Sequence, residues 1–130
     1  MMKKQIEVVA AVFKRNNTYF CAQRKDSGEL ARKWEFPGGK IELGESREEA
    51  IIREIKEELS ATIEINKYIT TVVHEYQSFI LTMHAYACEV IEGELVISEH
   101  LDAKWLSIDE MAQYDFAEAD LPIIEKLSVI

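Results

Sequence analysis

Runs of apolar residues alternate along the chain with short polar segments, and the length and period of each run predict its structure. Residues 6–13 (IEVVAAVF) form a short apolar run rich in β-branched side chains, which is typical of a buried strand. Residues 15–17 (RNN) favour a turn, and residues 18–23 return as a second strand. After a polar loop, the segment 34–40 (WEFPGGK) brings apolar bulk directly into a turn with two glycines. The N-terminal part therefore predicts a strand pair followed by a loop.

The clearest helix is predicted over residues 46–59. Ser46 and Glu49 form an S-x-x-E capping box, and residues 47–59 contain neither Gly nor Pro. At about 100° per residue, four aliphatic side chains fall within one arc and form the expected core face: Ile51, Ile52, Ile55 and Leu59. A separate arc of similar width carries three carboxylates: Glu54, Glu57 and Glu58.

The second half of the chain predicts more strands and then helices. Residues 63–74 and 79–90 have the pattern of long strands joined by a turn, and residues 103–106 form a shorter strand. A second capping box begins at Ser107, and a C-terminal helix is expected to begin at Asp120. This order of elements predicts a mixed α/β sandwich in a single domain over residues 1–130, not a regular doubly wound sheet.

The charge balance narrows the classes of function. The chain has 15 Lys and Arg against 24 Asp and Glu, a formal net charge of −9. We therefore expect no binding of duplex nucleic acid or of anionic membranes through the general field of the protein. A small anionic substrate remains compatible with this charge, because divalent metals can mediate the contact. Cys21 and Cys88 lie in apolar strand-like runs, and no targeting signal is evident, so we expect buried thiols and a cytoplasmic location.

The carboxylates of the predicted helix break local rules of helix stability. Glu54 and Glu58 are like charges four residues apart, and Glu57 and Glu58 lie in the last turn, where the helix dipole disfavours negative charge. Local rules are broken in this way at functional sites. Three oxygen-donor side chains on one face suit a hard cation such as Mg²⁺. The alternative is a solvated acidic face.

The spacing of these residues resembles a known sequence motif. From Gly39 the chain reads GKIELGESREEAIIREIKEELSA, which is similar to the Nudix box, Gx5Ex7REUxEExGU, where U is aliphatic. Seven fixed positions match at the correct spacing: Gly39, Glu45, Arg53, Glu54, Ile55, Glu57 and Glu58. Two final positions depart, with Ser60 in place of Gly and Ala61 in place of a larger aliphatic residue. The WEFPGGK segment, Trp105 and the C-terminal segment resemble the MutT branch, and CTP pyrophosphohydrolase-like members most of all.

The resemblance implies a Nudix-type α/β/α sandwich with a mixed β-sheet, and Mg²⁺-dependent hydrolysis with Mn²⁺ as a substitute. It implies that the metal ligands are the three helix carboxylates, Glu54, Glu57 and Glu58, with the carbonyl of Gly39. Glu99, six residues before Trp105, matches a loop glutamate that binds metal or acts as base. Its alternative is an exposed loop acid. Arg53 would orient the helix carboxylates, and Glu45 would pair with it.

Five further residues are candidates for contacts with a nucleotide. Arg24 and Lys40 could bind phosphate or could be surface charges. Phe36 and Tyr76 could line a pocket for the base, although an aromatic residue on a strand is more often part of the core. Asp120 matches a position near the base in MutT-like proteins, and it is equally expected as the N-cap of the C-terminal helix.

The resemblance implies a nucleoside triphosphate pyrophosphohydrolase that converts a (d)NTP to (d)NMP and pyrophosphate by attack of water at the β-phosphorus. An acceptor side chain at Asp120 favours a base edge that presents a donor, as in a cytosine-type or modified nucleotide. One alternative is an 8-oxo-dGTP diphosphatase, and another is a catalytically silent nucleotide-binding module. The partner is a small nucleotide, and the chain is expected to be a monomer or a homodimer.

Overall fold

The computed structural model describes residues 2–129, and their helices and strands follow the predicted order. The strands are β1 (Lys4–Arg15), β2 (Thr18–Gln23), β3 (Trp34–Glu35), β4 (Gly38–Lys40), β5 (Thr62–Glu75), β6 (Phe79–Glu92) and β7 (Asp102–Leu106). The helices are α1 (Arg47–Leu59), α2 (Ile108–Met111) and α3 (Leu121–Leu127), with a 3₁₀ turn at Glu118–Asp120. The sequence pattern missed β3 and β4, because strands of two and three residues are too short to show a period.

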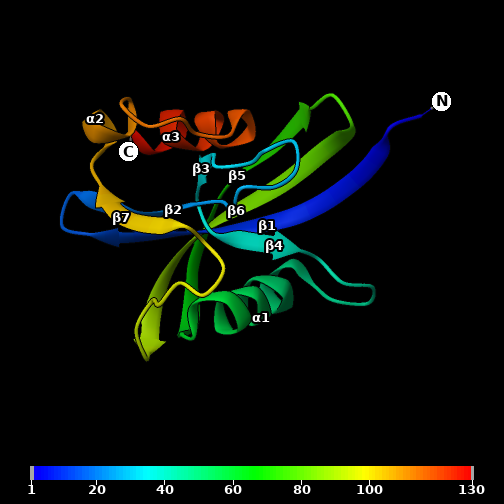
Figure 1. Cartoon of the computed structure of the whole chain (residues 1–130). Helices are drawn as coiled ribbons and strands as arrows, with labels where there is room; N and C mark the ends of the chain where they lie inside the picture. Colours follow the sequence, from blue (N-terminus) through cyan, green and yellow to red (C-terminus); the bar gives the residue numbers. More distant parts are fainter. Residues whose placement is uncertain (1, 130) are drawn as a thin grey trace.

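The sheet is mixed, as the element order predicts, and β1 lies at its centre. One edge of β1 pairs in parallel with β6, from Lys4 opposite Phe79 to Phe13 opposite Cys88. Its other edge pairs antiparallel with β4 and then with β2. β5 pairs antiparallel with β6, and β2 also pairs with β3 and β7. This pairing places the two glycines of β4, which the sequence pattern assigned to a turn, beside the middle of the sheet (Figure 1).

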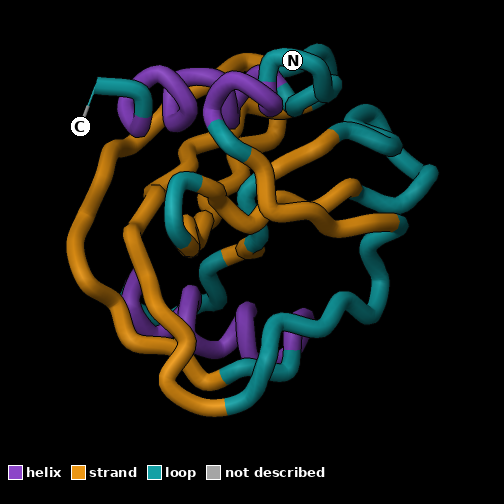
Figure 2. The backbone as a smooth tube through the Cα atoms, turned by 90° about the vertical axis from the view of Figure 1, so that its left-hand side faces the viewer, coloured by secondary structure: helices purple, strands orange, loops and turns teal. Residues whose placement is uncertain are grey.

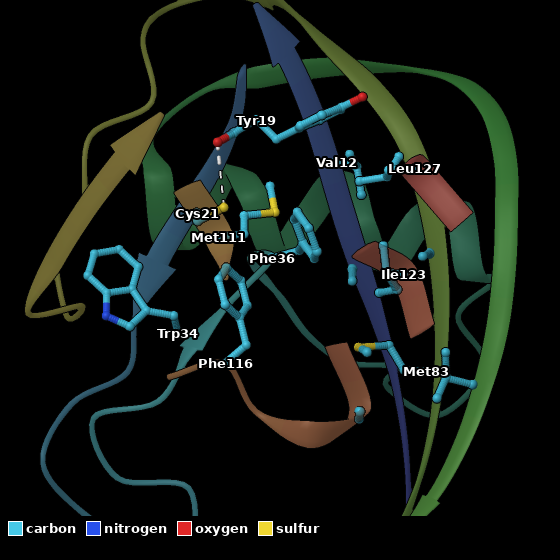
Figure 3. Close-up of a cluster of buried hydrophobic side chains, with 14 of the residues drawn as sticks. Val12, Tyr19, Cys21, Trp34, Phe36, Met83, Met111, Phe116, Ile123 and Leu127 are labelled. Carbon is cyan, nitrogen blue, oxygen red and sulfur yellow. Dashed lines mark hydrogen bonds between the residues drawn. The ribbon is translucent and has the colours of Figure 1, made fainter. Parts of the chain in front are cut away.

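Helices cover both faces of the sheet, with α1 on one side and α2 and α3 on the other (Figures 1 and 2). Successive residues of β1 point to opposite faces, as in any strand. Val9, Ala11 and Phe13 are buried in the cluster that contains the apolar side chains of α1. Ala10 and Val12 are buried in a second cluster, which contains residues of α2 and α3 (Figure 3). The α/β/α sandwich predicted from the resemblance is therefore observed.

Helix α1 begins as predicted, but its buried side is wider than predicted. Ser46 accepts from the Glu49 N–H at 3.0 Å, and the Glu49 side chain accepts from the Ser46 N–H at 2.9 Å, which completes the capping box. Ile51 is fully buried, together with Ile55 and Leu59. Ile52 is 40% exposed, so its expected place in the core is wrong. Ala50 is buried instead. The side of the helix that faces the sheet is therefore rotated from the predicted core face toward the face that carries the three carboxylates.

The end of α1 accommodates both departures from the motif. Ser60 has a left-handed backbone conformation (φ 61°, ψ 24°), and its N–H donates to the Lys56 carbonyl at 3.2 Å. This is the conformation that a Gly adopts at the end of a helix without steric cost. Ala61 is fully buried in the cluster under α1. The helix thus ends where the motif places its Gly, with a strained Ser in that position.

Both cysteines are buried, as their positions in apolar runs predict. Cys21 and Cys88 are buried and free. Burial raises the pKa of each thiol to about 12, which leaves both protonated at neutral pH. No helix among residues 2–129 is long and apolar enough to cross a membrane.

We predict that Ser60→Gly stabilises the protein by about 1 kcal/mol, because a side chain in the left-handed conformation costs roughly 1–2 kcal/mol and Gly gives back part of this as unfolded-state entropy. Chemical denaturation measures the gain as a higher midpoint at unchanged slope. Ser60→Ala retains the Cβ and is the matched control, which should show no gain. Equal midpoints for the Gly and Ala variants would contradict the prediction.

Candidate active site

Two of the three carboxylates of α1 lie on the buried side of the helix. With about 3.6 residues per turn, Glu54 and Glu58 stack between Ala50 and Ile51 on the helix surface. Both are partly buried, whereas the Glu57 side chain is 56% exposed. The helix therefore directs two acids toward the β4 side of the sheet and leaves the third at its edge.

Burial and mutual repulsion disfavour the charged forms of these two acids. Burial, together with the neighbouring charges of Glu54, Glu35 and Glu99, raises the pKa of Glu58 to about 7, against the lowering effect of His100. Burial also raises the pKa of Glu54, against the lowering effect of Arg53. A cation beside them would favour the ionised forms. Partly buried carboxylates with raised pKa values are typical of sites that bind a cation or move a proton.

The Glu54 carboxylate lies directly against the backbone of Gly39, so a side chain at this position would displace it. A Cβ at position 39 would collide with the carboxylate of Glu54. At position 38 a Cβ would collide with the backbone carbonyl of Val9 in β1. The two glycines therefore allow β4 to lie between the central strand and the carboxylates of α1, where the Gly39 backbone is close to the helix acids.

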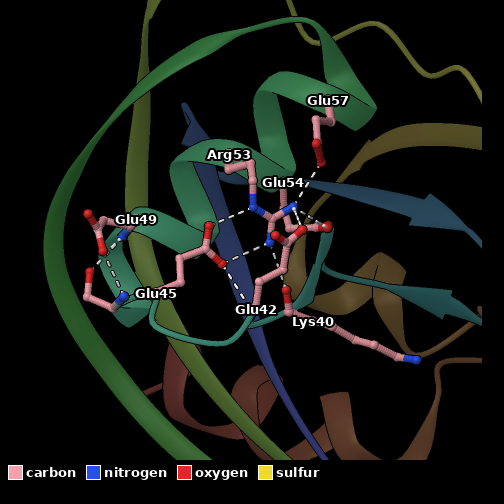
Figure 4. Close-up of polar contacts among 8 residues, drawn as sticks. Lys40, Glu42, Glu45, Glu49, Arg53, Glu54 and Glu57 are labelled. Carbon is pink, nitrogen blue, oxygen red and sulfur yellow. Dashed lines mark hydrogen bonds and ion pairs between the residues drawn. The ribbon is translucent and has the colours of Figure 1, made fainter.

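Arg53 joins the motif into one network (Figure 4). Its Nε and Nη2 donate to the two oxygens of Glu45 at 2.6 and 3.0 Å. Nη1 donates to Glu57 at 2.8 Å and to Glu54 at 3.2 Å, and Nη2 also donates to the Lys40 carbonyl at 2.9 Å. The Glu45 hydrogen bonds raise the pKa of Arg53 above its usual range, and Arg53 lowers the pKa of Glu45. One guanidinium thus fixes the helix, the loop before it and the end of β4.

The oxygen donors predicted as ligands fit a hard cation, although their side chains do not all point to one position. Among residues 2–129, no three acidic, imidazole or thiol side chains already form a ligand cluster. Glu57 instead contacts Arg53, and Glu99 is exposed on the loop before β7. Glu54, Glu58 and the Gly39 backbone supply oxygen donors, which Mg²⁺ prefers. Rotation of the exposed Glu57 side chain would complete the predicted set.

A single cavity of about 350 Å³ collects most of the predicted residues. Its lining includes eight of them: Arg24, Phe36, Gly39, Lys40, Glu58, Tyr76, Glu99 and Asp120. Glu45, Arg53, Glu54 and Glu57 do not line it but lie behind Gly39 and Lys40. Of the α1 carboxylates, Glu58 therefore lies at one end of the cavity, and the C-terminal segment lies at the other.

The wall near the C-terminal segment is aromatic and apolar. The rings of Tyr76 and Phe79 lie 5.0 Å apart, and Leu81 and Met83 continue the wall along β6. Tyr76 is buried, and its hydroxyl accepts from the Ala119 N–H at 2.8 Å. Phe36 is 2% exposed and packs in the core cluster of Figure 3. Both predicted aromatic residues thus belong to the core and also line the cavity.

Asp120 lies at this apolar end and does not cap α3. It is the last residue of the 3₁₀ turn, has a helical backbone conformation (φ −83°, ψ −18°) and makes no capping hydrogen bond. The N-cap prediction is therefore wrong, because a cap needs an extended backbone to direct its side chain at the helix N–H groups. Its carboxyl Oδ1 instead accepts from the Phe36 N–H at 3.0 Å. Burial raises the pKa of Asp120 well above its ordinary value, and the charge of Glu35 adds to this rise.

Glu35 and His100 also line the cavity, and the sequence analysis did not predict them as site residues. Glu35 accepts from Arg24 Nη1 at 3.0 Å through one oxygen and contacts His100 Nε2 at 3.0 Å through the other. The Arg24–Glu35 pair links a predicted phosphate contact to β3. The only sequence signal was proximity, since Glu35 adjoins Phe36 and His100 adjoins Glu99. Neither residue has the spacing of a metal ligand or a catalytic motif.

We predict that the stability of Asp120→Asn relative to that of the parent chain increases as the pH rises. The folded pKa of Asp120 is raised, so its contribution to stability is complete below its ordinary pKa of 3.8 and is lost as the pH rises toward the folded value. Asn stays neutral, and its Oδ1 can still accept from the Phe36 N–H. Melting temperatures of both chains from about pH 4 to about pH 8 give the difference. A difference that is constant or falls with pH would contradict this account.

Comparison with known proteins identifies the family of this chain. The family model for the NUDIX domain matches residues 8–126. The CTP pyrophosphohydrolase of Escherichia coli K12 is 38% identical over 122 residues, which cover 94% of this chain and 90% of that protein. The 8-oxo-dGTP diphosphatase of the same strain is 34% identical over 126 residues, which cover 97% and 98%.

A solved structure supports the same relationship. The solution structure of the E. coli ORF135 protein superposes with a TM-score of 0.82 at 36% identity, over 98% of this chain and 91% of that one. The structural match therefore extends over the whole sandwich and includes the α1 and β4 region that carries the motif. Helix α1 carries the motif sequence REIKEE at residues 53–58, and we call it the REIKEE helix. Its geometry is consistent with the family match and with the two enzyme relatives. The chain belongs to the NUDIX domain family as a Nudix hydrolase.

Proposed function

We propose that this Nudix hydrolase converts a nucleoside triphosphate and water to the monophosphate and pyrophosphate, in a reaction that depends on a divalent cation, with Mg²⁺ as the natural ion and Mn²⁺ as its substitute. The observation that carries the proposal is the shape of the cavity of about 350 Å³. It joins an apolar end, suited to a base, with an acidic end, suited to a metal-bound polyphosphate.

The acidic end holds the cation in this proposal. Glu54, Glu57 and Glu58 would bind it together with the Gly39 carbonyl, and Glu99 would approach from the opposite loop as a further ligand or as the base. The bound cation supplies charge neutralisation for the phosphates and lowers the pKa of the attacking water. Arg53 keeps the helix carboxylates in place through its two hydrogen bonds to Glu45.

The cationic side chains between the two ends would bind the phosphates. Arg24 is held by Glu35 beside the apolar pocket, and the exposed Lys40 lines the cavity near Gly39. Each therefore lies where a triphosphate would extend from the base toward α1. A charged side chain that is already held in place loses less entropy when the substrate binds.

The apolar end selects the base in this proposal. Tyr76, Phe79 and Phe36 offer rings against which a base can pack, and Asp120 is the buried polar group between them. An ionised Asp120 would accept from the exocyclic amine of a cytosine-type base. The 38% identity to a CTP pyrophosphohydrolase favours this choice. The 8-oxo-dGTP diphosphatase relative supports the alternative of an oxidised guanine nucleotide.

We further propose that the enzyme acts in the cytoplasm on small nucleotides and not on duplex nucleic acid, as a monomer or homodimer formed by a single domain over residues 1–130. The net charge of −9 supports the exclusion of nucleic acid.

We predict pyrophosphate release from canonical and modified (d)NTPs with Mg²⁺, fastest for cytosine-type substrates, and complete loss in excess EDTA. Glu58→Gln should lower kcat by roughly a hundredfold or more, because a ligand charge is lost. It should leave the melting temperature unchanged or higher at neutral pH, because burial disfavours the charge that it removes.

The control for this prediction is Glu48→Gln, which neutralises an exposed acid in the first turn of α1, away from the cavity. It should retain the activity of the parent chain. Full turnover in excess EDTA, or parental kcat in Glu58→Gln, would refute the assignment of the metal site. Nucleotide binding without any turnover would indicate the silent binding module instead.

We also predict that the water attacks the β-phosphorus. A bond then forms between the water oxygen and the β-phosphorus, and the bond from that phosphorus to the oxygen bridging the α-phosphate breaks, so the monophosphate leaves with the bridging oxygen. In ¹⁸O-water the label should enter pyrophosphate, as mass spectrometry of both products would show. Label in the monophosphate alone would place the attack at the α-phosphorus.

A further inference from the structure

The loop between β6 and β7, which contains Glu99, passes the C-terminal end of α1 (Figure 1). Glu99 itself is exposed, and it comes close enough to Glu58 to raise the pKa of that residue. The loop begins at Gly93, after the last residue of β6, and is anchored to α1 by the Val96 N–H, which donates to the Leu59 carbonyl at 2.9 Å. Loop residues are mobile unless such contacts hold them. The position of Glu99 therefore depends on its immediate neighbours.

Each neighbour of Glu99 makes one long-range hydrogen bond through its side chain. Ser98 Oγ donates to the Glu58 carbonyl at 3.1 Å, which ties the loop to the last turn of α1. His100 Nε2 lies 3.0 Å from a Glu35 oxygen, which ties the loop to β3. Because an ionised carboxylate only accepts hydrogen bonds, Nε2–H is the donor. Glu99 is thus held on both sides, once to the helix that carries the other acids and once to the sheet.

The His100 contact is buried and has no substitute. The His100 side chain is 8% exposed and that of Glu35 is 15% exposed. Within the described residues, His100 Nδ1 is buried without a hydrogen-bond partner, so the polar attachment of the ring rests on the Nε2 contact. The other oxygen of Glu35 accepts from Arg24, which fixes the carboxylate. A ring held through one buried hydrogen bond to a fixed acceptor has a defined position.

We propose that His100, with Ser98, is a positioning residue that holds Glu99 over the carboxylates of α1, and that the Glu35–His100 hydrogen bond is its principal attachment. We call the contacts of His100 and Ser98 the clamp. This inference rests on the proposed function, because the clamp has a purpose only if Glu99 acts in the reaction. His100 does not itself touch the reacting atoms. Its effect on the rate passes through the side chain of Glu99.

Two amide variants of His100 separate the hydrogen bond from the presence of a polar side chain. Gln can place its amide nitrogen near the position of the His Nε2 atom, whereas Asn reaches only about as far as Nδ1. His100→Asn should lower kcat by roughly tenfold to a hundredfold with little change in KM, which is the usual cost of losing a residue that orients a ligand. His100→Gln should recover most of that loss. Equal activity of the Asn and Gln variants would overturn the proposal.

A double-mutant cycle tests whether the effect passes through Glu99. In a Glu99→Gln background, His100→Asn should cause no further loss of kcat, because the side chain that it positions is already inactive. Losses that multiply in the double variant would assign His100 a role independent of Glu99 and would overturn the proposal. Ser98→Ala should show the same coupling to Glu99→Gln with a smaller loss.

A measurement that needs no turnover distinguishes failure of this inference from failure of the proposed function. ¹⁵N relaxation should show a lower order parameter for the Glu99 amide in His100→Asn than in the parent chain, and a value near that of the parent in His100→Gln. An unchanged order parameter in His100→Asn would overturn the clamp. If the parent chain hydrolyses no nucleotide while the order parameter falls as expected, the clamp stands and the proposed function fails.

Discussion

Strand β1 forms hydrogen bonds along both edges, and this pairing places every part of the site. Its parallel pairing with β6 runs from Lys4 to Phe13, and the side chains from Val9 to Phe13 are buried on both faces. The opposite edge pairs with β4 at Val8–Ala10, which leaves no room for a side chain on Gly38. Helix α1 then packs over β1 and β4, and its acids meet the backbone of Gly39. A shift of this register would separate the two glycines of β4 from the helix.

The acids of α1 are costly in this position, and Arg53 compensates only one part of the cost. Its guanidinium pairs with Glu45, Glu54 and Glu57, whereas Glu58 receives no such hydrogen bond from it. Glu58 is consequently the acid whose pKa rises to about 7. Burying an ionisable group beside like charges destabilises the folded state unless a counter-charge is bound. A cation bound beside these acids would relieve this repulsion.

On the other side of the cavity, Glu35 joins several parts of the site through hydrogen bonds, as Arg53 does beside α1. It holds Arg24 through one oxygen and His100 through the other, and its charge raises the pKa values of Asp120 and Glu58. One residue of a two-residue strand therefore influences the apolar end, the cationic side chain and the loop of Glu99. The partly buried Glu35 and the buried Asp120 also lie close to one another, with Arg24 as the nearby cation, which makes this the polar centre of an otherwise apolar wall.

The sequence by itself determined the features that depend on short spacing. The capping box at Ser46, the REIKEE helix and the order of the strands follow from residues within a few turns or a single strand of each other, where period and propensity act directly. Only the tertiary structure decided the partner of Asp120, which lies 84 residues away at Phe36, and the contact of Glu35 with His100, 65 residues apart. It also exposed Ile52, because the angle at which α1 meets the sheet is set by packing. Local patterns fix the longer helices and strands, whereas the short strands β3 and β4 and the contacts between distant residues depend on how those elements pack.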